Sequence, residues 1–219
     1  MPHARSGLLW YADAPLASID PVNLILLFAV LLLSLSVHEA AHAWSADRLG
    51  DRTARLLGRV SINPLVHIDP IGTVVFPLVA IFSGLPLIGW AKPVPVDTRN
   101  LQGDWRQKYM LIAAAGPVSN LAIACVAAAG AQLLPYGAVV QVLRGIVSLN
   151  VLLAVFNLVP VPPLDGGNVV SGLLRGPVAA MFDRIRPFGF VIIYALLLTG
   201  ILFSIVNPIR IRIESWLLY

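Results

Sequence analysis

The residues with the clearest chemistry are two histidines and a glutamate in the run His38-Glu39-Ala40-Ala41-His42. In a helix of 3.6 residues per turn, positions i and i+4 lie on one face, so His38 and His42 would point the same way. Two imidazoles one turn apart can hold one zinc ion, and the adjacent Glu39 can polarise a zinc-bound water. The motif therefore predicts a helix that carries a hydrolytic metal site.

The surroundings of this motif are apolar. Between Pro21 and Val37, the only polar side chains past Asn23 are Ser34 and Ser36. Of the 219 residues, 58% are hydrophobic and only 12% are charged, whereas soluble domains carry roughly 25% charged residues. These values indicate a polytopic membrane protein with the motif at membrane depth. Ionisable groups are costly there and usually functional, which favours a metal site over a chance occurrence of the motif.

A catalytic zinc ion usually has three protein ligands and a water, so a third ligand is required. Asp165 is the best candidate, because it follows a proline-rich segment at the end of an apolar run and precedes Gly166 and Gly167, which allow close backbone approach. Its alternative role is an Asx-turn. His67 is a second candidate, but a hydrogen bond that holds the loop over the site is the favoured role for it. The expected ligands of the one zinc ion per chain are His38, His42 and Asp165.

Long apolar runs predict the helices. Runs long enough to span a bilayer cover residues 21–47, 109–134, 139–157 and 188–206. A short helix is expected at 168–182, and a short strand suits 55–62. Prolines and glycines interrupt residues 71–90, and basic loops flank both ends, so a re-entrant segment is favoured there over a full crossing. The expected fold is an all-α polytopic membrane protein of about 4–5 spanning helices, with a re-entrant segment and short β-strands near the active site.

The distribution of positive charge predicts the orientation. Arg48, Arg52, Arg55 and Arg59 follow directly on the first span, which places this end, and the active site near it, on the cytoplasmic side of a cell membrane. Two further arginines, at positions 210 and 212, would then lie outside and count against this topology. Because the net charge is only +4 and the basic residues lie mostly between apolar runs, no nucleic-acid partner is expected. Cys125 is the only cysteine and excludes an internal disulfide.

Several motifs together resemble the site-2 protease family of intramembrane zinc metalloproteases. Each is weak alone, but their order and spacing over roughly positions 37 to 170 are specific. The motifs are His38-Glu39-x-x-His42, Asn63-Pro-x-x-His67-x-Asp69-Pro70, Trp90-Ala-Lys-Pro-Val-Pro95, Gly116-Pro-x-x-Asn120 and Asn157-x-x-Pro-x-x-Pro-x-Asp165-Gly-Gly167.

The resemblance implies an intramembrane zinc metalloendopeptidase that cleaves membrane-embedded protein segments, as in regulated intramembrane proteolysis. It implies that zinc is bound by the two histidines and Asp165, and that Glu39 is the general base toward a zinc-activated water. It also implies that Asn157 polarises the scissile carbonyl or supports the oxyanion. The substrate must present extended backbone, for which residues 71–90 and the segment Trp90–Pro95 are candidate pairing edges. Its partners would be a membrane-protein substrate and the lipid bilayer; the oligomeric state stays open.

The expected organisation has three parts. Residues 1–20 form an N-terminal arm, 21–206 a site-2-protease-like membrane metalloprotease domain, and 207–219 an amphipathic C-terminal tail. We expect a minimal member of the family, without a PDZ-like or CBS-like domain and without a span ahead of the motif helix. Two other classes compete: a membrane metal transporter or metal-binding protein, which would not need Glu39, and an inactive scaffold of the same fold, which would lack a ligand.

Overall fold

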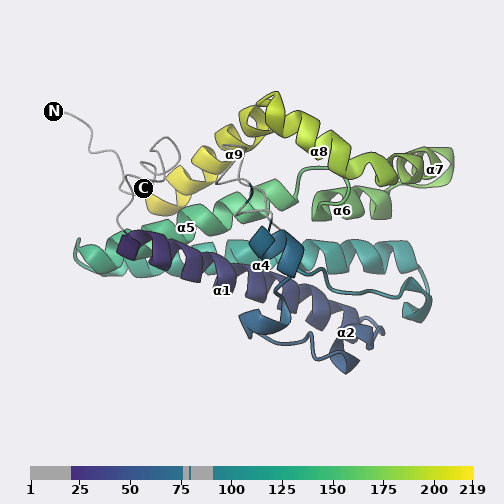
Figure 1. Ribbon diagram of the computed structural model, residues 1–219, viewed down its shortest axis with the longest axis horizontal. Helices are drawn as coiled ribbons and strands as arrows, with labels where there is room; N and C mark the ends of the chain where they lie inside the picture. The colour runs from purple at the N-terminus through teal and green to yellow at the C-terminus, as the bar shows by residue number, and fades with distance from the viewer. Residues whose placement is uncertain (1–20, 76–78, 80–90) are drawn as a thin grey trace.

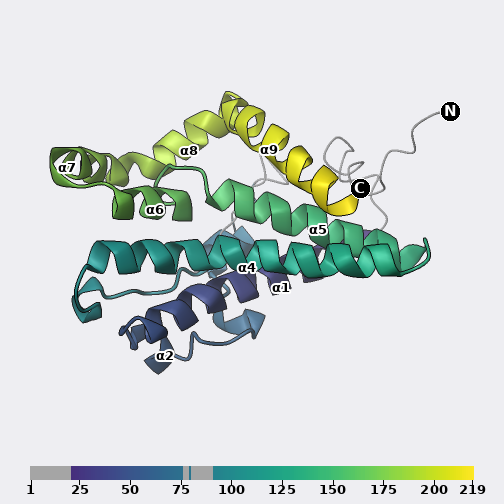
Figure 2. The same ribbon diagram turned by 180° about the vertical axis from the view of Figure 1, so that it is seen from behind.

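Three long antiparallel helices form the centre of the molecule. The computed structural model describes residues 21–75, 79 and 91–219, in which α1 (Pro21–Arg48), α4 (Trp105–Leu133) and α5 (Ala138–Asn157) lie side by side along the longest axis (Figures 1 and 2). Each is long and apolar enough to cross a membrane. The three corresponding helices expected from the sequence are therefore confirmed, with each end within four residues of the expected one.

Local side-chain contacts decide where these helices begin and end. The Asp104 carboxylate accepts hydrogen bonds from the backbone N–H groups of Arg106 and Gln107, so α4 begins four residues earlier than its apolar run. At the end of α1, the Lys108 ammonium donates to the Leu49 carbonyl (3.1 Å). This contact joins the C-terminal end of α1 to the N-terminal end of α4, where a positive charge is favourable for the α1 dipole.

The short helix expected after α5 is two helices, α6 (Asp165–Leu173) and α7 (Gly176–Ile185). The break falls at Gly176, whose φ of +62° lies in the left-handed region. On the α4 side, the Arg106 guanidinium donates to the Ser171 carbonyl (3.2 Å) and to the Asp183 carboxylate (3.1 Å). Both short helices are thereby attached to the beginning of α4.

The expected span over 188–206 is not one continuous helix. The chain forms α8 (Gly189–Leu198) and α9 (Ile201–Leu218), and an angle of 77° separates the two helical segments on either side of Gly200, whose φ is +75°. Together they form an arch over α5 (Figure 1), and α9 includes the expected C-terminal tail except Tyr219. The described residues thus hold three candidate spans, or four if the bent pair is one span, against the 4–5 expected.

The expected short strands are also wrong for the part of the chain that the structure describes. Residues 53–56 are helical (α2, Thr53–Leu56), Gly58 has a φ of +68°, and the chain then runs without regular structure to the 3-10 turn η3 (Pro64–Val66). The Arg59 guanidinium, not a backbone ladder, joins this segment to the Lys92 and Pro93 carbonyls (2.9 and 3.2 Å). Proline lacks the N–H that a ladder requires.

Two expectations concern residues outside the described part. The N-terminal arm lies wholly outside it, and of the expected re-entrant segment only residue 79 and residues 71–75, which belong to the π-helical turn η4 (Pro70–Val75), are described. The 3-10 turn η5 (Thr98–Asn100) follows in the next described part. The choice between re-entry and crossing for 71–90 therefore stays a prediction.

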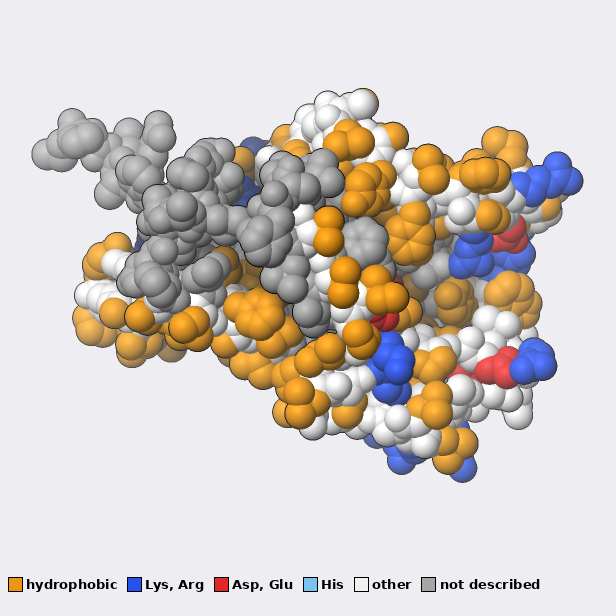
Figure 3. All heavy atoms as spheres, viewed as in Figure 1, with side chains coloured by type: hydrophobic (Ala, Val, Ile, Leu, Met, Phe, Trp, Pro, Cys, Tyr) orange, Lys and Arg blue, Asp and Glu red, His pale blue; other side chains and the backbone are white. Residues whose placement is uncertain are grey.

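Small side chains allow the central helices to pack closely. The core between α4, α5 and the bent pair contains fully or almost fully buried residues: Ala124, Ala128, Val147, Val151, Leu202 and Val206. On the face seen in Figure 3, hydrophobic side chains cover most of the described surface, and Lys and Arg gather toward the end where α2, α6 and α7 lie. This surface is that of a membrane protein with one basic end.

Candidate metal centre

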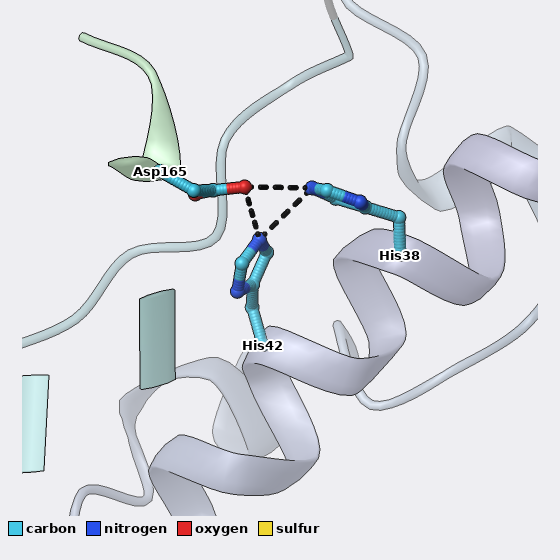
Figure 4. A group of neighbouring side chains, drawn as sticks. All are labelled: His38, His42 and Asp165. Carbon is cyan, nitrogen blue, oxygen red and sulfur yellow. Dashed lines mark hydrogen bonds and ion pairs between the residues drawn. The ribbon is translucent and has the colours of Figure 1, made fainter. Parts of the chain in front are cut away.

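Three side chains from distant parts of the chain meet at one point. His38 and His42 project from the same face of α1, one turn apart, and Asp165 reaches them from the first turn of α6 (Figure 4). The two Nε2 atoms are 3.0 Å apart, and the Asp165 Oδ2 lies 3.0 Å from His38 Nε2 and 3.3 Å from His42 Nε2. Both histidines are buried, and the aspartate is half-buried.

The outer nitrogen of each imidazole is hydrogen-bonded to an oxygen of α4. His42 Nδ1 lies 2.6 Å from the Ile112 carbonyl, which can only accept, so this nitrogen carries the proton. His38 Nδ1 lies 2.6 Å from the Asn120 side-chain oxygen. In its neutral form, each ring therefore turns an unprotonated Nε2 toward the centre, the arrangement that ligand histidines have in metal sites.

With both rings neutral, the centre consequently offers three electron-pair donors, because an aspartic acid is ordinarily ionised near neutral pH. Three such atoms at 3.0–3.3 Å repel one another unless a cation lies between them. Ligands of tetrahedral zinc, about 2.0–2.1 Å from the metal, are about 3.3 Å apart, so this donor set fits zinc.

A glycine of α4 leaves the space beside the two imidazoles. A Cβ atom on Gly116 would lie 2.5 Å from His38 Nε2 and closer still to His42 Nε2. No side chain fits at this position while both rings keep their places. The backbone of α4 thus forms one wall of the metal centre.

Close backbone approach also sets the position of Asp165. A Cβ on Gly167 would lie 2.5 Å from the backbone nitrogen of Pro162, and a Cβ on Gly166 would meet the Leu158 carbonyl. The beginning of α6 therefore packs directly on the proline-rich segment that follows α5. The sequence-based expectation that these two glycines allow close approach agrees with this packing.

The remaining residues singled out by the sequence have different surroundings. Glu39 is half-buried on α1, and no hydrogen bond joins its carboxylate to the part of the chain that the structure describes. Asn157 is half-buried at the end of α5, where its amide donates to the Leu153 carbonyl (3.0 Å). His67 is buried away from the metal group and lies 2.7 Å from the Ser61 carbonyl, as the loop-holding interpretation expects.

Sequence reasoning missed the supports of the imidazoles. Asn120 and Gly116 occur in one quoted motif, but their contacts with the histidines were not inferred. Asn150 was not singled out, although a buried amide in an apolar span is itself a signal, because it requires partners.

Comparison with known proteins identifies the family of this chain. The family model described as peptidase family M50 matches residues 131–200. "Putative zinc metalloprotease YwhC" of Bacillus subtilis (strain 168) is 36% identical over 183 residues, which cover 79% of this chain and 80% of that protein. "Putative zinc metalloprotease Rip2" of Mycolicibacterium smegmatis (strain ATCC 700084 / mc(2)155) is 31% identical over 203 residues, or 90% and 76% of the two chains. No solved structure matches the chain.

These matches confirm the resemblance to the site-2 protease family and the expectation of a zinc metalloprotease. The identity to the Bacillus protein extends over most of both chains, and the chain belongs to peptidase family M50.

Proposed function

We propose that the chain is an intramembrane endopeptidase that hydrolyses peptide bonds in membrane-embedded protein segments, with one zinc ion held by His38, His42 and Asp165. The observation that carries this proposal is the convergence of two imidazole nitrogens on a membrane-length helix and the carboxylate of a distant aspartate, all within 3.3 Å of one another. Zinc, when bound, supplies a Lewis acid that makes water more acidic and polarises a peptide carbonyl. The chain's own residues supply the proton transfers and the orientation of the substrate.

Glu39 is the proposed general base. It follows His38 directly, so its side chain leaves α1 about 100° around the helix from the first ligand and close to the same level. A half-buried carboxylate without a hydrogen bond to the described residues is available to accept a proton from water. Glu39 takes that proton as the bond to the carbonyl carbon forms and returns it to the leaving amine.

Asn157 is the proposed donor to the carbonyl oxygen of the substrate. Its amide nitrogen donates to the Leu153 carbonyl, one turn earlier in α5, and an amide has a second N–H for another acceptor. The residue lies at the last position of α5, eight positions before Asp165, with the proline-rich segment between them. An amide N–H there would stabilise negative charge that develops on the substrate oxygen.

The substrate must be extended where it is cut, because a helix keeps its carbonyls bonded internally. Residues 91–97 have no helical structure, and the Lys92 N–H donates to the His67 carbonyl (2.8 Å). Arg59 also holds this segment, through its bonds to the Lys92 and Pro93 carbonyls. A non-helical segment fixed in this way is a suitable edge for pairing with substrate backbone.

The proposed orientation places the metal centre near the cytoplasmic face. Basic residues follow α1, precede α4 and follow α6, and the metal-site histidines lie in the half of α1 that ends at this basic region. His42 precedes Arg48 by six residues, or about 9 Å along a helix. Water can reach this depth from the basic end, whereas the substrate segment enters from the bilayer.

The test of the proposed function is cleavage by purified protein in detergent or proteoliposomes, with a membrane-helix substrate. Glu39→Gln should retain zinc and the fold but lose cleavage, since only proton transfer is removed. His38→Ala should lose both zinc and cleavage. Appreciable turnover by Glu39→Gln would refute its role as base, and zinc-loaded wild-type protein that transports metal but cleaves no substrate would favour the transporter class.

A further inference from the structure

A connected set of buried polar side chains leads from His38 into α5. Asn120, whose oxygen faces His38 Nδ1, donates through its amide nitrogen to the Asn150 oxygen (2.9 Å). Asn150 in turn donates to the Ser34 hydroxyl (3.0 Å) and to the Ile146 carbonyl (2.9 Å). Both asparagines have no exposed surface, and His38 and Ser34 are almost fully buried. Such a network is costly in an apolar core unless every member is satisfied, and here it leads directly to a metal-site histidine.

The direction of this chain of hydrogen bonds is fixed at its far end. The Ile146 carbonyl can only accept, so the group of Asn150 that faces it must be the NH2. The Asn150 oxygen therefore faces Asn120, which must donate its own NH2 and turn its oxygen toward His38. That oxygen requires a proton on His38 Nδ1, which leaves the Nε2 lone pair for the metal.

We propose that Asn150 is a positioning residue of the metal centre: acting through Asn120, it fixes the tautomer and the ring orientation of His38 that metal binding requires. The inference rests on the proposed assignment of His38 as a ligand. His42 provides an internal contrast, because the Ile112 carbonyl fixes its tautomer directly and no relay is needed. The tautomer of His42 is thus fixed by a backbone carbonyl. The tautomer of His38 is fixed by Asn150, which is separated from the metal by two side chains, those of Asn120 and His38.

Without Asn150, the side-chain amide of Asn120 should no longer be held in one orientation. In Asn150→Leu, the acceptor that remains for the Asn120 NH2 is the Ser34 carbonyl at 3.4 Å, a long contact. The amide is then free to rotate and to present its NH2 to His38 Nδ1. A donor there favours the tautomer with the proton on Nε2, and that proton would point at His42 Nε2 and at Asp165. Zinc must then displace it.

The experiment measures the zinc dissociation constant of the full chain in detergent, by competition with a chelator. Asn150→Leu should bind zinc about 10–100-fold more weakly than wild type, as outer-shell changes do. Asn150→Asp should stay within a few-fold of wild type, because either protonation state keeps an acceptor toward Asn120. Val151→Ala is the matched control: this neighbour on α5 is fully buried but apolar, so its truncation lowers the unfolding temperature without changing zinc affinity.

The tautomer of His38 can also be measured directly in the wild-type protein, without a substitution at Asn150. Nitrogen NMR of 15N-histidine-labelled, metal-free protein distinguishes protonated from unprotonated ring nitrogens, and His38→Ala identifies the signals. We expect Nδ1 of His38 to carry a proton in wild type and to lose it in Asn150→Leu. A His38 ring without a proton on Nδ1 in the wild-type protein would overturn the proposal even if the leucine variant did not fold.

The affinity results also separate this inference from the proposed function. Wild-type zinc affinity in Asn150→Leu, beside a His38→Ala protein that binds none, would overturn the relay and leave the ligand assignment standing. Equal weakening in Asn150→Leu and in the isosteric Asn150→Asp would mean that an acceptor toward Asn120 does not preserve zinc affinity, and would also overturn the relay. Zinc retained by His38→Ala would overturn the ligand set and the inference together.

Discussion

The substitution Gly116→Ala tests the shape of the metal centre with one methyl group. The added Cβ would lie 2.5 Å from His38 Nε2, whereas ordinary contacts begin at 3.4 Å, so this imidazole must retreat by about 0.9 Å. A metal–ligand distance can deviate from its usual value by only about 0.2 Å. At least one zinc bond is therefore lost, and we expect zinc affinity to fall at least 100-fold, or about 2.7 kcal/mol at 1.36 kcal/mol per tenfold.

The same helix supplies a matched control in Gly130→Ala. A Cβ there meets only the side chain of Leu143, at 3.4 Å, an ordinary contact. Because alanine favours a helix interior over glycine by roughly 0.5–1 kcal/mol, Gly130→Ala should be at least as stable as wild type and bind zinc normally. Both proteins would be compared by chelator competition and thermal unfolding in the same detergent. Equal zinc affinity in the two variants would refute the placement of Gly116 against the imidazoles.

Three further predictions address catalysis, the loops and orientation. Asn157→Ala should retain zinc and its unfolding temperature but lose about 10²–10³ in kcat, the usual value of one oxyanion donor; loss of zinc with a proportional loss of activity would make the residue structural. Asp51 is buried and accepts four hydrogen bonds from two loops. Burial raises the pKa of its carboxyl, but these bonds lower it further, so its stabilising contribution is present above pH 3.8, its ordinary pKa, and is lost as pH falls through the lower folded value. We expect Asp51→Ala to lower stability by about 3 kcal/mol in thermal unfolding, and an unchanged midpoint would contradict this. In a Cys125→Ala background, cysteines introduced at Arg55 and Arg99 should both be labelled from the cytoplasmic side; opposite labelling would mean that residues 71–90 cross the membrane.

The sequence was sufficient for the parts of the fold that depend on local pattern. Long apolar runs predicted α1, α4 and α5, because length and hydropathy decide whether a helix can span a bilayer. The i, i+4 spacing of His38 and His42 predicted their common face for the same reason. Asp165 could be predicted to join them because the prolines and glycines around it mark an irregular segment at the end of a span.

The failures concern features that depend on tertiary contacts or on a single dihedral angle. Gly200 sits within an unbroken apolar run, so composition gave no sign that its left-handed φ would divide one span into α8 and α9. The expected strand at 55–62 fitted β-propensity, but no partner backbone pairs with it among the described residues, and Arg59 makes the connection instead. The contact of Asn120 with Asn150 depends on how α4 and α5 are aligned along each other, and no local pattern specifies that alignment.

Zinc K-edge X-ray absorption of the purified, zinc-loaded chain tests the ligand set most directly. The account predicts two imidazole nitrogens and light oxygen ligands at about 2.0–2.2 Å, with no sulfur. It further predicts that the imidazole scattering falls to one ring in His42→Ala under excess zinc and is unchanged in His67→Ala. A sulfur shell at about 2.3 Å, three imidazoles in wild type, or loss of a ring in His67→Ala would contradict the assignment of His38, His42 and Asp165 as the zinc ligands.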